Sequence, residues 1–327
     1  MHMIADPTMQ AHGARTEAAK LPAHWTPSMM NTPWVESPFF DELLAESALT
    51  DAEKEQARHF AEEGYLIVDT AIAETVLDAA VRDVGTRTDA PSQCGQRLQD
   101  ANSGAVRSIA GNPGIIALLR MLYRREPIAF QTLNFQKGTE QPIHSDAIHF
   151  HSIPARFLCG VWVALEDIDD DNGPLVIYPQ SHRLPTYDMH DIGAPTGIAA
   201  YHHCYETFAE ALMRAHDLSA RHIHLRKGQA VFWAANLHHG GSPVRDRERT
   251  RWSQVTHYFF QDSCYYTPLC SDAAIGILAL RSIHDLITGE PVPNLYRGKP
   301  LPPEPHPQAS QPLMHRLMRA VQQQLAL

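Results

Sequence analysis

The sequence lacks the hallmarks of secreted, membrane-spanning and nucleic-acid-binding proteins. Its 327 residues include five cysteines, an odd number with no C-x-x-C pair, which argues against a disulfide framework or a zinc knuckle. No run approaches the roughly 18 to 20 apolar residues that span a bilayer, and the first residues contain no apolar signal segment. The formal net charge is -10, with no basic run. We therefore expect a reduced cytoplasmic protein with no nucleic-acid or membrane partner.

The hydrophobic content of 44% is enough for a large core, and the texture of the chain divides it into four parts. Residues 1–48 lack periodicity and predict an arm that is loose or drapes over the core. The pattern of residues 49–127 predicts a mixed, mainly helical part that packs on the core. The pattern of residues 128–262 predicts a β-rich core. Residues 263–327 form a C-terminal extension that ends in an amphipathic helix carrying Leu313, Leu317 and Val321 on one face.

The N-terminal half carries three helix signals. Thr50 and Glu53 have capping-box spacing, which predicts a helix through Glu63 that ends at Gly64, followed by a short strand over residues 65–68. Two further helices are expected over residues 72–88 and 112–122.

From Pro127 onward the chain consists of short apolar runs broken by Gly, Pro and Asp, a pattern typical of an antiparallel sandwich or barrel. These runs are IAFQTLNF, ARFLCGVWVALEDI, GPLVIYP, HIHLRKGQAVFWAA and RWSQVTHYFF. The insert 181–221 is long for a loop, has one helical stretch at 205–216, and is expected to act as a lid.

The stretch QPIHSDAIHFH is a candidate metal site. In a strand, residues two apart share a face, so His144 and Asp146 can present an imidazole and a carboxylate side by side. Chance alone gives about one such tripeptide in a chain with 20 histidines, so a polar edge strand without metal is the competing interpretation. The same alternation places His149 and His151 on the opposite face, away from a substrate, unless the strand bends.

A second histidine source strengthens the metal hypothesis. The strand GQAVFWAAN leads into Leu237-His238-His239-Gly240-Gly241, and a later strand begins Arg251-Trp252-Ser253. One His-x-Asp pair with one distant His is the facial triad of non-haem Fe(II) oxygenases, which leaves positions open for a chelating cosubstrate and O₂. Arg251 and Ser253 share a strand face and can bind a carboxylate, such as that of 2-oxoglutarate.

The sequence resembles the phytanoyl-CoA dioxygenase family of Fe(II)/2-oxoglutarate oxygenases, which includes the ectoine hydroxylases. The resemblance covers about residues 49–260 and is carried, in the family's order, by LTDAEKEQARHFAEEGYLIV, HSDAIHFH, GVWVALEDIDDDNGPLVIYPQSHR, AANLHHGGSP and RTRWSQVTHYF. It implies a mainly β fold with flanking helices around a double-stranded β-helix, the jelly-roll or cupin-like core.

The resemblance also implies roles for particular residues. Fe(II) would be bound by His144, Asp146 and His239, the histidine directly before Gly240, while His238 would face away. The distal carboxylate of 2-oxoglutarate would be bound by Arg251 with Ser253. Trp162, Asn134 and Gln131 would line the cosubstrate pocket, although each has an alternative role in packing or backbone hydrogen bonding.

Two departures from the family pattern concern the periphery of this site. Gln180 stands where the family has a glycine before Ser-His, and His182 is interpreted as structural. The spacing from His239 to Arg251 is about one residue longer than in many relatives. Arg249 therefore competes with Arg251 as the residue that binds the distal carboxylate of 2-oxoglutarate. Arg245 and Arg247 lie in the same charged run, which favours a solvated turn.

The implied function is 2-oxoglutarate-dependent hydroxylation of an unactivated C–H bond in a small molecule, with release of succinate and CO₂. The Asp146 carboxylate argues against halogenation, since related halogenases have a small residue there. Desaturation, epimerisation and cyclisation stay open, as do a non-catalytic cupin-like metal-binding protein and a metal-free barrel. An acyl-CoA would need a positive patch that the sequence does not reveal, and Arg156 is assigned to the surface rather than to an anionic substrate. We therefore expect a secondary-metabolite or amino-acid-like substrate, and the oligomeric state is left open.

Overall fold

The computed structural model describes residues 24–86, 97–99 and 103–301. The predicted C-terminal helix, with Leu313, Leu317 and Val321, and one of the five cysteines, Cys94, lie outside these ranges. Within them, no helix has both the length and the apolar content to cross a membrane.

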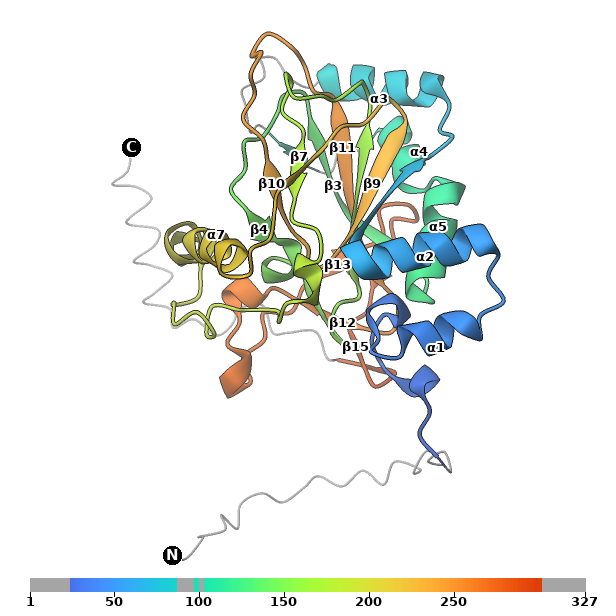
Figure 1. The fold of residues 1–327 in the computed structure, drawn as a ribbon, viewed down its shortest axis with the longest axis vertical. Coiled ribbons are helices and arrows are strands. Elements are labelled where there is room, and N and C mark those ends of the chain that lie inside the picture. The colour runs from blue at the N-terminus through green and yellow to red at the C-terminus, as the bar shows by residue number, and fades with distance from the viewer. Residues whose placement is uncertain (1–23, 87–96, 100–102, 302–327) are drawn as a thin grey trace, which may run out of the picture.

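Two antiparallel sheets face each other and form the core of the protein (Figure 1). The order of the larger sheet is β1 (Tyr65–Asp69), β9 (Gln229–Ala234), β6 (Leu158–Ala164), β11 (Ser253–Phe260), β3 (Pro127–Phe135) and β2 (Leu98–Gln99). The order of the smaller sheet is β4 (His144–Ser145), β10 (His238–Gly241), β7 (Leu175–Ile177) and β8 (Arg221–Ile223). Aromatic and aliphatic side chains from both sheets fill the space between them. The predicted jelly-roll fold is confirmed.

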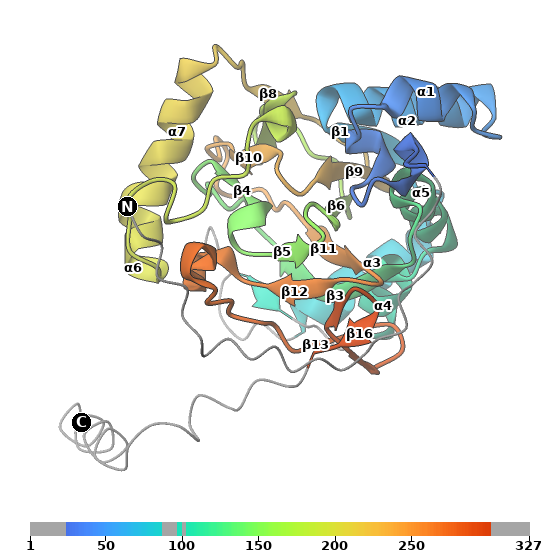
Figure 2. The same cartoon turned by 90° about the horizontal axis from the view of Figure 1, so that it is seen from below.

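Helices cover the outer face of the larger sheet, as Figures 1 and 2 show. They are α1 (Phe40–Ala45), α2 (Asp51–Glu63), α3 (Glu74–Gly85), α4 (Gly104–Ala110) and α5 (Pro113–Tyr123). The capping box that predicted α2 is present, because Thr50 Oγ1 accepts from Glu53 N at 3.3 Å and Glu53 Oε2 accepts from Thr50 N at 2.8 Å. The seven-residue α4 was missed, since two turns are too short to establish a helical period.

The remaining elements lie around the open end of the jelly roll. The predicted lid carries α6 (Ile198–Ala200), a π-helical turn (Tyr201–Tyr205) and α7 (Glu206–Ala215). It buries its aromatic residues against the turn that follows β4 and against Leu269. The C-terminal part adds β12 (Cys264–Tyr266), which pairs with β5 (His151–Ile153), and the hairpins β13–β14 (Ile283–His284, Pro291–Val292) and β15–β16 (Leu295–Tyr296, Lys299–Pro300).

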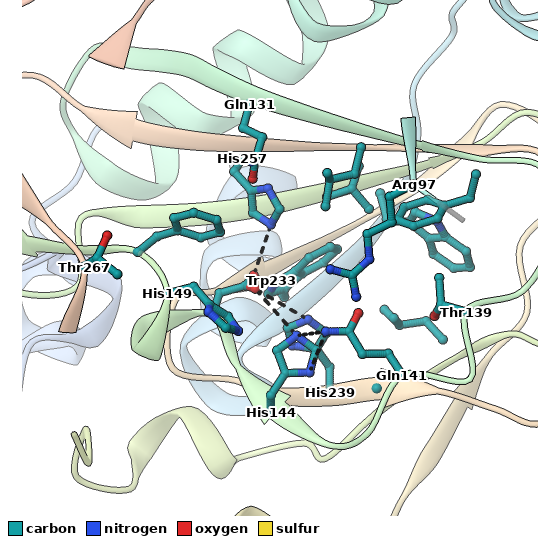
Figure 3. Close-up of a pocket in the computed structure, with 18 of the residues that line it drawn as sticks. Arg97, Gln131, Thr139, Gln141, His144, His149, Trp233, His239, His257 and Thr267 are labelled. Carbon is teal, nitrogen blue, oxygen red and sulfur yellow. Dashed lines mark hydrogen bonds and ion pairs between the residues drawn. The ribbon is translucent and has the colours of Figure 1, made fainter. Parts of the chain in front are cut away.

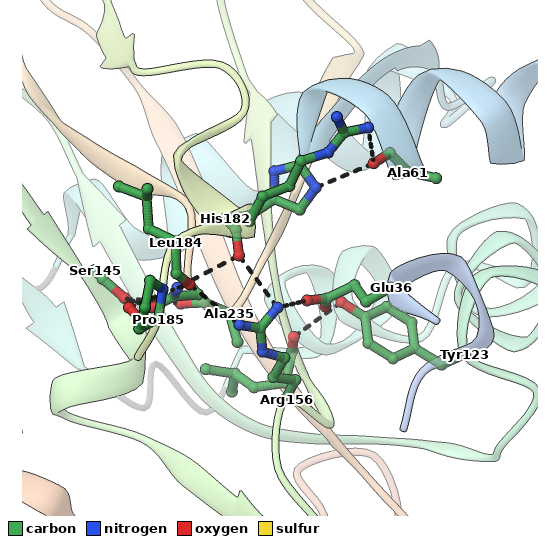
Figure 4. Close-up of polar contacts among 12 residues, drawn as sticks. Glu36, Ala61, Tyr123, Ser145, Arg156, His182, Leu184, Pro185 and Ala235 are labelled. Atoms are coloured by element: carbon green, nitrogen blue, oxygen red, sulfur yellow. Dashed lines mark hydrogen bonds and ion pairs between the residues drawn. The ribbon is translucent and has the colours of Figure 1, made fainter. Parts of the chain in front are cut away.

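An ion pair fixes the described part of the N-terminal arm to the core (Figure 4). Arg156 Nη1 donates to Glu36 Oε2 at 2.8 Å, and the same guanidinium donates to the carbonyls of His182 and Leu184. The Glu36 side chain is 2% exposed, so this carboxylate depends on Arg156 for its charge partner. Arg156 therefore joins the arm to the loop after β7 and does not lie on the open surface.

The helix α2 and the turn after β7 meet at two residues with left-handed backbone. Gly64 has φ 81°, and a Cβ there would lie 2.3 Å from His182 Nδ1. Gln180 has φ 70° and donates its backbone N–H to Glu63 O at 3.0 Å. Gln180 thus adopts the conformation that glycine favours, even though it has a side chain. His182 is buried and donates from Nε2 to Ala61 O at 3.2 Å, which agrees with its predicted structural role.

We predict opposite effects on stability for substitutions at these two positions. Gln180→Gly removes left-handed strain and should raise the free energy of unfolding by about 1 kcal/mol. Gly64→Ala adds the same strain and a collision with the His182 ring, so it should lower that energy by about 2–4 kcal/mol. Urea denaturation of both variants measures this, and an unchanged or less stable Gln180→Gly would contradict the strain argument.

Candidate metal centre

The three predicted metal ligands converge where β4 meets β10. His144 and His239 are directly opposite each other in this strand pair. Asp146 does not continue the strand but opens a 3-10 turn (Asp146–Ile148), which directs its carboxylate back toward the two imidazoles. One ligand atom from each of the three residues lies within 4.8 Å of the other two, and all three side chains are buried. Among the described residues this is the one group of three or more with such geometry.

The Asp146 carboxylate is oriented by two side chains from the larger sheet. Trp233 Nε1 donates to Oδ2 at 2.7 Å, and His257 Nε2 lies 3.5 Å from the same oxygen. The other oxygen, Oδ1, is 3.9 Å from Nε2 of His144 and 3.9 Å from Nε2 of His239. Bonds of about 2.0–2.2 Å on either side of one ion can span that separation. Oδ1 is therefore the oxygen that could bind a metal ion together with the two imidazoles, and Oδ2 is the atom that the protein holds.

The position of the Trp233 indole depends on Gly160 in the neighbouring strand β6. Gly160 and Trp233 are directly opposite each other, and a Cβ on Gly160 would lie 2.2 Å from the indole ring. No side chain fits between this backbone and the ring. The glycine of the motif GVWV thus determines where the Asp146 carboxylate points.

Backbone carbonyls orient the two imidazoles. His144 Nδ1 is 2.9 Å from Pro142 O, and His239 Nδ1 is 3.0 Å from Leu237 O. If each Nδ1 carries the proton that it donates, each Nε2 keeps its lone pair, which is the form that binds a metal. Burial, together with the nearby His239, lowers the pKa of His144 well below its ordinary value and favours this neutral form. Burial alone would raise the pKa of Asp146, but His239 and His257 lower it below its usual range, so the carboxylate is ionised.

The triad lies in a cavity of about 300 Å³ between the two sheets (Figure 3). Arg251 lines this cavity, with its guanidinium 5.2 Å from the ring centre of Trp162 and Nη1 donating to Gly173 O at 3.0 Å. Arg249 lies outside it and pairs with both carboxylate oxygens of Asp169. Of the two arginines left open by the sequence, Arg251 is the one that faces the triad's cavity.

The other predicted pocket residues divide between the two faces of their strands. Trp162 and Gln131 line the cavity as expected. Ser253 is buried, donates to Arg251 O at 3.3 Å and does not line the cavity. The prediction for Asn134 was wrong, because it lies opposite Gln254, whose amide donates to Val106 O in α4. Register therefore places Asn134 on the helix-covered face of β3, while Gln131 faces the cavity.

Three further histidine predictions can be compared with their surroundings. His238 is buried outside the cavity, as its position one residue from His239 implied. His149 was expected on the opposite face, but the 3-10 turn reverses the alternation and brings it into the cavity, with its ring 6.0 Å from that of His144. Burial lowers the pKa of His149 to about 4. His151 lies in β5 against Tyr266, away from the cavity.

Sequence reasoning missed several residues of the site. His257 shares a strand face with Arg251, and the same period of two could have identified it. Trp233, Arg97, Thr267 and Arg281 gave no comparable signal, because their positions depend on how distant segments pack. The predicted lid, residues 181–221, contributes no lining residue and touches the cavity through the contact of Tyr201 with His149.

Comparison with known proteins agrees with this geometry. The family model for phytanoyl-CoA dioxygenase matches residues 43–251, more than half of the chain. The chain belongs to the phytanoyl-CoA dioxygenase family. A "Probable phytanoyl-CoA dioxygenase" of Caenorhabditis elegans is 28% identical over 163 residues, which are 49% of this chain and 48% of that protein. The chain thus spans about half the length of the curated relatives that it matches.

Two solved structures show the same fold. The epimerase SnoN from nogalamycin biosynthesis, described as non-haem and α-ketoglutarate dependent, is 22% identical, with a TM-score of 0.54 over 77% of this chain and 96% of its own. EctD from S. alaskensis, solved with 2-oxoglutarate and 5-hydroxyectoine, is 19% identical, with a TM-score of 0.52 over 69% of this chain and 84% of its own. At these identities the likeness establishes only that the two solved structures share the jelly-roll fold of this chain.

We predict that the adjacent histidines differ in metal affinity. His239→Gln removes a ligand and should weaken binding of Fe(II) or Co(II) by more than about 100-fold, since loss of a ligand costs more than loss of a supporting contact. His238→Gln is the matched control, because it changes the neighbouring side chain outside the cavity. Anaerobic titration calorimetry measures both, and equal losses in the two variants would refute this ligand assignment.

We also predict that the hydrogen bond from the Trp233 indole to Asp146 increases the affinity of the site for a metal ion. Trp233→Phe keeps an aromatic ring but removes the hydrogen bond to Asp146 Oδ2, and should weaken metal binding by about 10–100-fold. Trp252→Phe is the control, because Trp252 lies outside the cavity, and this substitution should leave the metal affinity unchanged. The affinity of each variant for Co(II) tests this, and a Trp233→Phe protein with unaltered affinity would show that the bond does not orient the carboxylate.

Proposed function

We propose that this protein is an Fe(II)- and 2-oxoglutarate-dependent dioxygenase that hydroxylates a C–H bond of a small molecule and releases succinate and CO₂. The observation that carries the proposal is the meeting of His144, Asp146 and His239 in one cavity that also contains Arg251. Two imidazoles and one carboxylate suit ferrous iron and leave coordination positions open. The family membership of the chain supports the same chemistry.

The donor set fits the metal in charge as well as in geometry. Two neutral imidazoles and one carboxylate leave a divalent ion with a net positive charge, which favours a dianionic chelating cosubstrate. When bound, iron with 2-oxoglutarate and O₂ supplies the oxidising power that no amino-acid side chain provides. Gln141 Nε2 lies 3.0 Å from His144 Nε2, so binding of the ion requires the displacement of this amide.

Arg251 supplies the second anchor for 2-oxoglutarate. Its guanidinium is 3% exposed and packs beside the rings of Trp162 and Phe135, so it can pair with a carboxylate away from bulk water. Charge-assisted hydrogen bonds of this kind are strong and directional. A metal-storage protein has no use for such an arginine, and this favours turnover over a non-catalytic metal-binding role.

Hydroxylation is the outcome that we propose, because the Asp146 carboxylate keeps the coordination position that a halide would need. Epimerisation, desaturation and cyclisation depend on which hydrogen of the substrate faces the metal, and they are alternative outcomes of the same site. A cytoplasmic location stays a prediction, made from the cysteine pattern.

The test is anaerobic addition of Fe(II) and 2-oxoglutarate, which should produce the weak visible charge-transfer band of the chelate. Arg251→Gln should raise the 2-oxoglutarate concentration needed for half of the band by about 10–100-fold, the value of a lost charge-assisted bond. Arg249→Gln removes the same charge outside the cavity and serves as the matched control. The absence of the band in the unaltered protein, or equal effects of the two variants, would reject the proposal.

A further inference from the structure

The cavity contains a second arginine, partly buried, that the proposed chemistry does not use. Arg281 comes from the C-terminal part of the chain, beyond the jelly roll, and lines the same cavity as the triad. Its guanidinium carbon lies 4.8 Å from the ring centre of Phe150 and 5.8 Å from that of Phe130. The Phe150 ring is 5.0 Å from the ring of His257, which contacts Asp146. Arg281 is thus separated from the metal ligands by a layer of rings.

The hydrogen-bonding capacity of Arg281 is only partly used. Nη1 donates to Thr267 Oγ1 at 2.9 Å, which orients the guanidinium. Nε is buried without an acceptor, and no carboxylate among the described residues pairs with this side chain. A buried N–H without a partner costs about 1–3 kcal/mol. The edge formed by Nε and Nη2 has the geometry that binds the two oxygens of a carboxylate.

Arg97 brings another positive charge to the cavity. It lines the cavity together with Arg281, and Figure 3 shows its side chain pointing inward. No hydrogen bond or ion pair joins Arg97 to another described residue. An exposed arginine at the cavity can attract an anion during its approach, before any contact is made.

The balance of charge then points to the substrate. In the proposed complex the charges of Fe(II) and 2-oxoglutarate cancel, and the charge of Asp146 cancels that of Arg251. Arg97 and Arg281 are left as two positive charges without a partner in a cavity with one described carboxylate, Asp146. An anionic ligand in this cavity would supply the counterion that these two guanidinium groups lack among the described residues.

From these observations we propose that the substrate oxidised by this protein carries a carboxylate, that Arg281 binds this carboxylate, and that an apolar part of the same molecule packs against Phe130 and Phe150. This inference rests on the proposed function, because it names the substrate class of the same site. The rings beside Arg281 reduce its contact with water, which strengthens the pairing with a carboxylate.

The test measures binding and does not require turnover. Saturation-transfer NMR on the anaerobic complex with Fe(II) and saturating 2-oxoglutarate compares two acids, 3-phenylpropanoate and octanoate, with their primary amides. Acid and amide differ in charge but hardly in shape. We expect the acids to bind about 10–100-fold more tightly than the amides, the value of a charge-assisted pair.

Variants locate the source of this preference. Arg281→Gln should reduce the affinity for the acids to that for the amides, and Arg281→Lys, which keeps the charge but loses the fork, should reduce it partly. Arg226→Gln is the matched control, because this exposed arginine lies outside the cavity. If Arg281→Gln fails to unfold cooperatively, the comparison is made with Arg281→Lys, which preserves the cation beside the rings.

The outcomes separate this inference from the function on which it rests. Equal binding of acids and amides to a protein that forms the charge-transfer band, or an acid preference that survives both substitutions of Arg281, would overturn the carboxylate assignment. A missing charge-transfer band would reject the proposed function instead, whatever the acids do.

Discussion

The geometry of the site depends on the hydrogen bond from Trp233 to Asp146. A carboxylate has two equivalent oxygens, and this bond, with His257 beside it, occupies one of them so that the other faces both imidazoles. The indole and His257 belong to the larger sheet, whereas both histidine ligands belong to the smaller one. The bond is therefore made across the interior of the jelly roll, and the site forms only if the two sheets are in the correct register.

The sequence predicted those elements whose structure depends on residues close to one another in the chain. The α2 capping box, the period of two from Arg251 into β11, and the His-x-Asp spacing all depend on neighbours within a few residues. The failures have equally specific causes. Alternation did not place His149, because a 3-10 turn interrupts the strand, and Asn134 was assigned without the register that fixes its face. Arg97 and Arg281 could not be predicted, since tertiary packing alone brings them to the cavity.

The residues that line the cavity come from two parts of the chain, one inside and one after the family match. His144 and His239 lie on strands of the jelly roll, Asp146 directly follows β4 and Arg251 lies just before β11, and all four lie within the family match, at residues 43–251. Thr267, Arg281 and the partner strand of β5 lie after it. The residues proposed to bind the metal and 2-oxoglutarate thus lie within the family match, whereas Arg281, proposed to bind the substrate carboxylate, lies after it.

The ion pair between Glu36 and Arg156 shows that the folded unit is larger than the family match. Glu36 precedes residue 43, where that match begins, and its carboxylate neutralises a guanidinium that also holds the loop after β7. A shortened chain that starts at Leu43 would leave that guanidinium without its counterion. Boundaries drawn from sequence similarity would therefore divide a cooperative unit, and expression of the matched segment alone would yield a less stable protein.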